Sequence, residues 1–316
     1  MNSIARRTFL SGVTALAVTA TLSPWHATHA QSQSKRTRLI LLGTGGGPHV
    51  AIPGRARPAS LLLINGVPYV VDCGSGVSQQ IVSAGVPLDT LRYIFLTHHH
   101  SDHNLDYGNL IYNGWASGLR TRVDTYGPPP LKAMTDTYFE LNKFDIETRI
   151  ADEGRVDLRN LIVAHEFDRP GLVMQNEEVK VTAARVRHPR ITQTYAYRFD
   201  TAERSIVLAG DTTYSPELIE LAKGADVLVH EIIHLGGLDR LLKRNPNAAT
   251  LREHLLASHS VPEDVGKVAA AARVKTLVLS HLVPSDDPAL TDADWMEGVR
   301  MHYSGQVIVG RDLMEL

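Results

Sequence analysis

Hydrophobic residues in this chain are gathered into short runs with strand character, and turn residues separate the runs. Runs rich in Val, Ile, Leu and aromatic residues predict buried or half-buried strands. A strong hairpin signal, Asn65-Gly66, joins two of the runs. The pattern predicts strands at 39–42, 59–64, 69–72, 91–97, 179–186, 195–199, 205–209, 227–229 and 276–279.

Segments with helical character lie between many of these runs. The pattern predicts helices at 77–84, 105–115, 131–142, 216–223 and 262–272. Residues 116–165 are less regular and contain the break Gly127-Pro-Pro-Pro130, so we expect an insertion there that covers the substrate. Strands interspersed with helices, without an internal repeat, indicate one α/β domain.

The N-terminus has the pattern of an export signal. Arg6 and Arg7 form a twin-arginine start, an apolar stretch runs to about Leu22, and small residues at 27–30 offer a cleavage site. The stretch is too short for a comfortable membrane span, and an uncleaved anchor is the alternative. We therefore expect residues 1–30 to be a signal peptide read by the twin-arginine export machinery. The mature protein, 31–316, would be periplasmic or secreted, with no stable membrane span after cleavage.

The composition narrows the possible chemistry. The chain has 316 residues, 43% hydrophobic and 21% charged, as is ordinary for a soluble globular protein. Its net charge of −2 predicts no general affinity for nucleic acid. Fifteen His against one Cys favour metal sites made of imidazole and carboxylate over thiolate sites.

Residues 97–103, Thr-His-His-His-Ser-Asp-His, concentrate metal-ligand side chains directly after a predicted strand. His98 and His100 are two apart, so in an extended backbone they point to the same side and can chelate one ion. Asp102 and His103 lie past the turn and can face a second ion. Imidazole with carboxylate suits zinc, with iron or manganese also possible.

Three later residues of ligand type follow apolar runs in the same manner. They are His188, Asp211 and His281. Because α/β sheets place their chemistry at the carboxyl ends of strands, we expect these residues to meet the histidine run. The glycine-rich segment 43–48 is not a dinucleotide fingerprint, since Pro48 replaces its third glycine and no helix follows. We expect this loop to bring backbone close to the substrate or the metal site.

The motif His98-x-His100-x-Asp102-His103, with the three later ligands, resembles the metallo-β-lactamase superfamily over about residues 39–309. The resemblance implies a four-layer αββα sandwich and two divalent metal ions. The expected first-metal ligands are His98, His100 and His188. The expected second-metal ligands are Asp102, His103 and His281, and Asp211 resembles the bridging carboxylate. Asp72 matches an acidic residue that orients the site.

Further motifs are similar to the ribonuclease Z and arylsulfatase branch of this superfamily. They are segments 42–45 and 71–76, the pair His230-Glu231, and Ser258-His259-Ser260. The resemblance implies that His259, held by Glu231, contacts the phosphate and donates a proton. A surface histidine at the start of a helix is the alternative for His259. The remaining His165, His234 and His254 are expected to be ordinary surface or loop histidines.

The resemblance implies a hydrolase in which a metal-bridging hydroxide attacks phosphorus, sulfur or a carbonyl carbon. His259 would protonate the leaving group, and Asp102 could share in accepting the proton of the water. Catalytic roles are thus expected for Asp102, His259 and Glu231.

The expected substrate is a small phosphodiester, an aryl sulfate or a related ester. No nucleic acid is expected, because region 120–165 has no concentrated basic run and export would separate the enzyme from transfer RNA. A lactonase or carboxyl-ester hydrolase, and a small-molecule biosynthetic protein that keeps the fold, are the alternatives. Whether the protein is a homodimer stays open. Candidate aromatic walls of the site are Tyr112, Trp115 and Tyr195, with core packing as the alternative.

Overall fold

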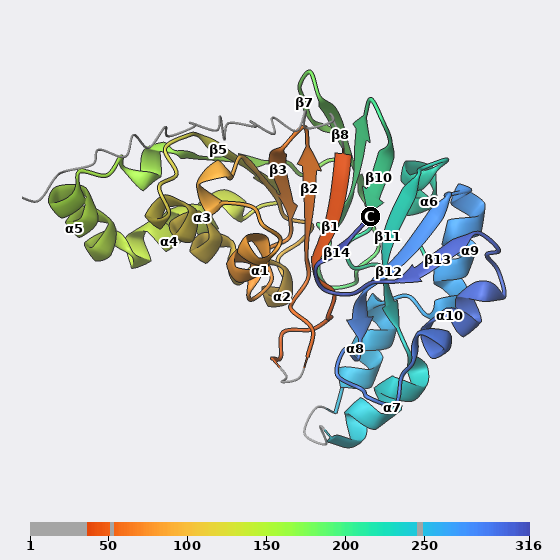
Figure 1. Cartoon of the computed structure of the whole chain (residues 1–316). Helices are drawn as coiled ribbons and strands as arrows, with labels where there is room; N and C mark the ends of the chain where they lie inside the picture. The colour runs from red at the N-terminus through yellow and green to blue at the C-terminus, as the bar shows by residue number, and fades with distance from the viewer. Residues whose placement is uncertain (1–36, 51–53, 245–248) are drawn as a thin grey trace, which may run out of the picture. The chain divides into compact units, whose positions relative to one another are not determined.

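A computed structural model describes residues 37–50, 54–244 and 249–316 (Figure 1). The expected signal peptide, residues 1–30, lies outside the described residues. Within the described part, no helix is both long and apolar enough to cross a membrane.

The first sheet has seven strands, and hydrophobic side chains fill both of its faces. In spatial order its strands are β14 (Met314–Glu315), β1 (Thr37–Gly43), β2 (Ala59–Ile64), β3 (Val67–Val71), β4 (Tyr93–Phe95), β5 (Val123–Gly127) and β6 (Ile162–Glu166). The turn Asn65-Gly66 connects β2 and β3 as predicted, and both residues have positive φ angles, as a tight hairpin turn requires.

The second sheet also has seven strands, and the four strands at one side of it run parallel to their neighbours. In spatial order its strands are β13 (Gln306–Val309), β12 (Thr276–Val283), β11 (Val227–Ile233), β10 (Ser205–Leu208), β9 (Tyr195–Thr201), β8 (Val179–Arg185) and β7 (Gly171–Gln175). The register pairs Leu208 with Val229 and Val229 with Val278. The carboxyl ends of β10, β11 and β12 therefore lie together at one edge.

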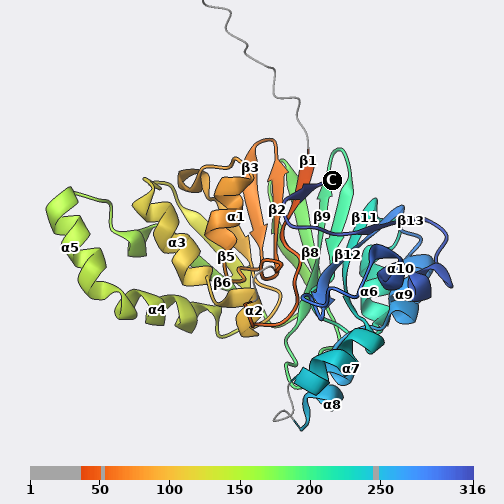
Figure 2. The same cartoon turned by 60° about the horizontal axis from the view of Figure 1, so that its bottom comes forward.

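Helices cover the outer face of each sheet (Figure 2). The first sheet is covered by α1 (Val77–Ser83), α3 (Tyr107–Ala116), α4 (Leu131–Leu141) and α5 (Lys143–Glu153). The second sheet is covered by α6 (Pro216–Ala222), α9 (Pro262–Ala272) and α10 (Asp292–Arg300). Between the sheets, aromatic side chains pack edge to face, as in Phe95 against Phe199 at 5.3 Å between ring centroids. The layers are αββα, which confirms the predicted fold.

Three helices of the described part of the chain lie outside these two layers, and all three are near the expected site. They are α2 (Ser101–Asn104), α7 (Leu235–Arg244) and α8 (Leu251–Ser258). The helices α7 and α8 lie side by side below the second sheet in Figure 1. They pack on a small core of their own, made by Ile233, Leu238 and Val283.

Residues 116–165 are more regular than predicted. The segment contains β5, β6, α4 and α5, where only one helix was expected. The two strands extend the first sheet by pairing in parallel with β4 and with each other. Pairing with a distant strand stabilises β structure that local propensity alone does not indicate.

Candidate metal centre

The first group of candidate ligands gathers around His100. Its Nδ1 lies 3.1 Å from Nε2 of His98 and 3.0 Å from Nε2 of His188. Together with Asp211, each of these residues offers one ligand atom within 4.8 Å of the others. Burial lowers the pKa of His98 well below its usual range and lowers that of His100 to about 4. Neutral imidazoles present lone pairs, which is the state that a metal ligand requires.

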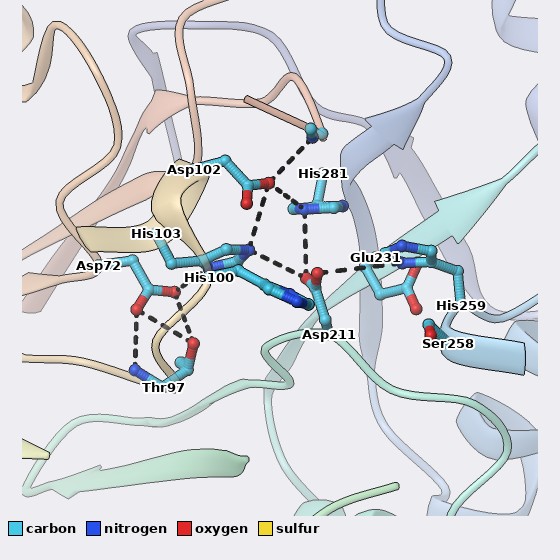
Figure 3. Close-up of polar contacts among 12 residues, drawn as sticks. Asp72, Thr97, His100, Asp102, His103, Asp211, Glu231, Ser258, His259 and His281 are labelled. Carbon is cyan, nitrogen blue, oxygen red and sulfur yellow. Dashed lines mark hydrogen bonds and ion pairs between the residues drawn. The ribbon is translucent and has the colours of Figure 1, made fainter. Parts of the chain in front are cut away.

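The second group combines two histidines with two carboxylates (Figure 3). Nε2 of His281 lies 3.3 Å from Oδ2 of Asp102 and 3.2 Å from Oδ1 of Asp211. Nε2 of His103 lies 3.2 Å from the same Oδ1 of Asp211. All four residues are buried, so their convergence is not a solvated surface cluster.

Asp211 belongs to both groups. Its Oδ1 faces His103 and His281, and its Oδ2 lies 3.9 Å from Nε2 of His98. Burial alone would raise the pKa of Asp211, but His281 and His103 outweigh it and lower the pKa well below its usual range. Oδ1 of Asp211 and Nε2 of His103 are buried and make no hydrogen bond within the described residues. Buried polar atoms that converge in this way without a hydrogen bond fit a divalent cation between them.

Asp72 orients the histidine run through hydrogen bonds to His103 and Thr97. Its Oδ2 accepts a hydrogen bond from Nδ1 of His103 at 2.8 Å, and its Oδ1 accepts one from the backbone N–H of Thr97 at 2.8 Å. The bond to Nδ1 fixes the ring so that Nε2 of His103 points into the centre. Asp72 has a left-handed φ of 63°, which aims its side chain across the end of β4.

His188 is oriented by helix α8. Its Nδ1 donates a hydrogen bond to the backbone oxygen of Ser258, the last residue of α8, at 2.9 Å. This bond leaves Nε2 of His188 for the first group. The position of α8 is therefore coupled to the geometry of the candidate ligands.

His281 lies inside strand β12, and not at its end as the sequence predicted. The strand continues to Val283, and the pairing register between β11 and β12 shifts at this point. His281 has a φ of 46°, so the chain bulges locally and turns the imidazole into the site.

The glycine-rich loop approaches the centre, as predicted. The backbone N–H of Gly47 donates to Oδ2 of Asp102 at 2.9 Å. A Cβ at Gly46 would lie 2.6 Å from Nδ1 of His281, so only glycine fits there. The buried Arg57 side chain fixes the loop by donating to the backbone oxygens of Gly46 and Gly47. Sequence reasoning missed Arg57, because one arginine in a loop has no distinguishing pattern.

Glu231 and His259 form a buried pair beside Asp211. Oε2 of Glu231 lies 3.4 Å from Nδ1 of His259, while Oε1 accepts hydrogen bonds from the backbone N–H groups of Thr212 and Ser260. Burial alone would lower the pKa of His259, but Glu231 outweighs it and raises that pKa to about 9. An imidazolium is a proton donor and offers no lone pair to a metal, so this pair differs in chemistry from the neutral first group.

A cavity of about 600 Å³ opens over the centre. Its floor contains His100, Asp102, Asp211, His259 and His281. Residues from α7 and α8 form one wall, and His254 of α8 is among them. No motif in the sequence marks His254 as a residue of this cavity, and its ring centroid lies 6.2 Å from that of His100.

Several residues that the sequence predicted near the substrate do not line the cavity. Trp115 and Tyr195 are buried in the hydrophobic cores and are not walls of the site. Residues 116–165 are all described, and none of them lines this cavity. Helix α5 in this segment lies far from α7 and α8 in both views (Figures 1 and 2). A substrate-covering role for this segment stays a prediction.

Comparison with known proteins agrees with this arrangement. The family model of the β-lactamase superfamily domain matches residues 68–282. Ribonuclease Z of Mycobacterium bovis is 30% identical over 278 residues, which cover 87% of this chain and 96% of that protein. The crystal structure of the short form of human tRNase Z superposes with a TM-score of 0.65 at 21% identity, over 88% of this chain and 98% of that one.

A second solved structure with a similar fold contains a metal ion. Zn²⁺-bound PqqB from Methylobacterium extorquens superposes with a TM-score of 0.60 at 12% identity, over 89% of this chain and 99% of that one. The expectation that nucleic acid is not a partner disagrees with the name of the relative from Mycobacterium bovis, ribonuclease Z. At 30% identity, the disagreement concerns the family and not this chain in particular. The chain therefore belongs to the metallo-β-lactamase-fold hydrolases of the β-lactamase superfamily, and its similarity to ribonuclease Z extends over most of its length.

Proposed function

We propose that this protein is a two-metal hydrolase that cleaves a small phosphodiester, an aryl sulfate or a related ester. The observation that supports this most is the position of Asp211 between two ligand groups, beside the charged His259. Cleavage of such an ester needs an activated water, neutralisation of oxyanion charge and a proton for the leaving group. The residues around one cavity could supply all three.

Two divalent ions fit the candidate ligands. His98, His100 and His188 would bind one ion, Asp102, His103 and His281 would bind the other, and Asp211 would bridge them. The mixture of imidazole and carboxylate suits zinc, with iron or manganese possible, and a structural neighbour binds Zn²⁺. When bound, such ions lower the pKa of water and neutralise the charge that develops on the ester oxygens.

The proton steps belong to residues of the chain. His259 would give the proton on Nε2 to the departing oxygen, while Glu231 holds Nδ1 on the other side of the ring. Asp102 faces the same cavity, and its carboxylate is the candidate acceptor for a proton of the attacking water. The bond from Gly47 N–H keeps Asp102 in that orientation.

A second candidate function is the hydrolysis of RNA. The observation that favours it is the 30% identity to ribonuclease Z over 87% of the chain. The two candidates differ in substrate, and they share the metal centre and the proton donor.

We also propose that the protein is exported by the twin-arginine route. The support is the sequence Arg6-Arg7 followed by an apolar stretch and small residues. Fusing residues 1–35 to a reporter that works only after folded export tests this proposal. The fusion should depend on Arg6 and Arg7, and an Arg6→Lys, Arg7→Lys variant that still exports would contradict it.

A parallel activity screen tests the proposed function. The metal-loaded protein would be assayed on bis-aryl phosphodiester, aryl sulfate, lactone, cephalosporin and precursor transfer RNA, with a chelated sample as the control. Metal-dependent turnover of the phosphodiester or the sulfate above all others is the expected result. Faster turnover of the lactone, of the cephalosporin or of the RNA would contradict the proposal.

A further inference from the structure

One wall of the cavity is made of aliphatic side chains. They come from both helices of the α7–α8 pair and from the end of β12, and they are Leu241, Leu251, Leu255, Val283 and Pro284. Leu251 and Leu255 are only partly buried in the free protein. Apolar side chains that line a cavity beside a reaction centre favour an apolar group of the ligand.

Helix α8 carries part of this wall, and the candidate proton donor lies at its end. Leu251, His254 and Leu255 are spaced by three and four residues, so they share one face of the helix. His259 caps the same helix at its C-terminus and faces the same cavity. A leaving group that takes its proton from His259 would therefore lie against the α8 face.

The charges at the rim compensate one another. Asp286 lies 3.3 Å from the guanidinium of Arg244 and 3.6 Å from the ring of His49. A polynucleotide needs a groove with cations for its phosphates and flat aromatic faces for its bases. Among the described residues that line the cavity there is no Phe, Tyr or Trp, and its one arginine is paired.

We propose that α7, α8 and the end of β12 form a leaving-group pocket for the uncharged, apolar alcohol or phenol half of the ester. This inference rests on the proposed function for the bond that is cleaved, and it adds the chemical class of the leaving group. The cavity of about 600 Å³ has room for a substituted aryl group above the metal centre.

A homologous series of substrates tests the pocket. Methyl aryl phosphodiesters and aryl sulfates would be compared with phenyl, 4-ethylphenyl and 4-butylphenyl leaving groups, because 4-alkyl chains hardly change the acidity of the phenol. The expected kcat/KM rises about fourfold for each methylene that enters the pocket. A 4-carboxymethylphenyl ester, which places a charge at the same point, should react more slowly than the phenyl ester.

Variants locate the effect on α8. Leu251→Gln and Leu255→Gln should each abolish most of the gain per methylene, whereas Glu253→Gln, on the exposed side of the same helix, should keep it. A flat alkyl series in the unmodified protein would overturn the pocket, as would a gain that survives both leucine variants. Turnover of precursor transfer RNA above every aryl ester would overturn it as well.

A binding measurement separates this inference from the proposed function. Calorimetric titration of the products phenol and 4-butylphenol into the full chain needs no catalysis. Tighter binding of 4-butylphenol that is lost in Leu251→Gln supports the pocket even if no ester is cleaved, in which case the proposed function fails alone. Ester cleavage with equal binding of the two phenols would overturn the pocket alone.

Discussion

Oε2 of Glu231 lies 3.4 Å from Nδ1 of His259, and two backbone N–H groups fix the other oxygen of the same carboxylate. The arrangement keeps the imidazole charged and in one orientation beside Asp211 in the floor of the cavity. A donor held in this way matters most when the leaving oxygen is a strong base.

His259→Ala should therefore lower the rate of hydrolysis more for esters with poor leaving groups than for esters with good ones. We expect kcat for a phenyl ester to fall at least about 100-fold, and kcat for a 4-nitrophenyl ester to fall less than about tenfold. Steady-state kinetics on both esters provide the measurement, with the exposed His302→Ala as a matched control. Equal losses on the two esters would refute the role of proton donor.

Glu231→Gln tests the residue that positions this donor. The amide keeps the shape of the side chain and removes the charge that raises the pKa of His259. We expect kcat to depend on the leaving group in the same way as in His259→Ala, with a smaller loss of kcat. The metal content should stay near normal. A variant that loses metal and shows no dependence on the leaving group would place Glu231 among the ligands.

Asp72→Asn tests the support of the histidine run. Loss of the carboxylate that accepts from Nδ1 of His103 should weaken metal binding by about 10- to 100-fold. Competition with a chromogenic chelator measures this affinity, and Asp168→Asn, at an exposed position, is the control. Unchanged affinity would show that Asp72 does not orient the ligand.

The ion pair between Arg240 and Asp287 should stabilise α7 in a pH-dependent manner. Its atoms lie 2.6 Å apart. Burial alone would raise the pKa of Asp287, but Arg240 and the N–H of Ala289 outweigh it and lower that pKa below 3.8. A lowered pKa means that the stabilisation is present above the ordinary carboxyl pKa and is lost as the pH falls through the folded-state value.

Asp287→Asn should accordingly lower the free energy of unfolding at neutral pH by about 1 kcal/mol, since Arg240 is half exposed. Thermal unfolding of the protein and the variant at neutral pH and near pH 3 provides the measurement. The difference in Tm should shrink at the acidic pH. The same difference at both values would mean that packing, and not charge, is responsible.

The sequence predicted the ligand groups because most of these residues follow apolar runs directly, and such runs form strands whose ends meet. It placed His281 at a strand end, whereas the left-handed backbone at that residue lets β12 continue to Val283. It took His254 for an ordinary surface or loop histidine, because only the packing of α7 on α8 and of both on the end of β12 brings that ring to the cavity. Long-range packing of this kind has no local signature in the chain.

Long-range packing also explains why the strands of segment 116–165 were not predicted from the sequence. These strands have weak local patterns and depend on long-range pairing. Strand β5 pairs with β4, which precedes it by about thirty residues in the aligned register, and β6 pairs with β5. Helix α10, by contrast, begins with a capping box at Thr291 and Asp294, a local signal that the sequence does contain.

The shared position of Asp211 is the central claim, and metal stoichiometry tests it most directly. Elemental analysis of the zinc-loaded protein should find two ions per chain, and Asp211→Ala should retain fewer, with Asp168→Ala as a control that keeps both. Two tightly bound ions in Asp211→Ala, or a single ion in the unmodified protein, would contradict a centre in which this carboxylate bridges two metals.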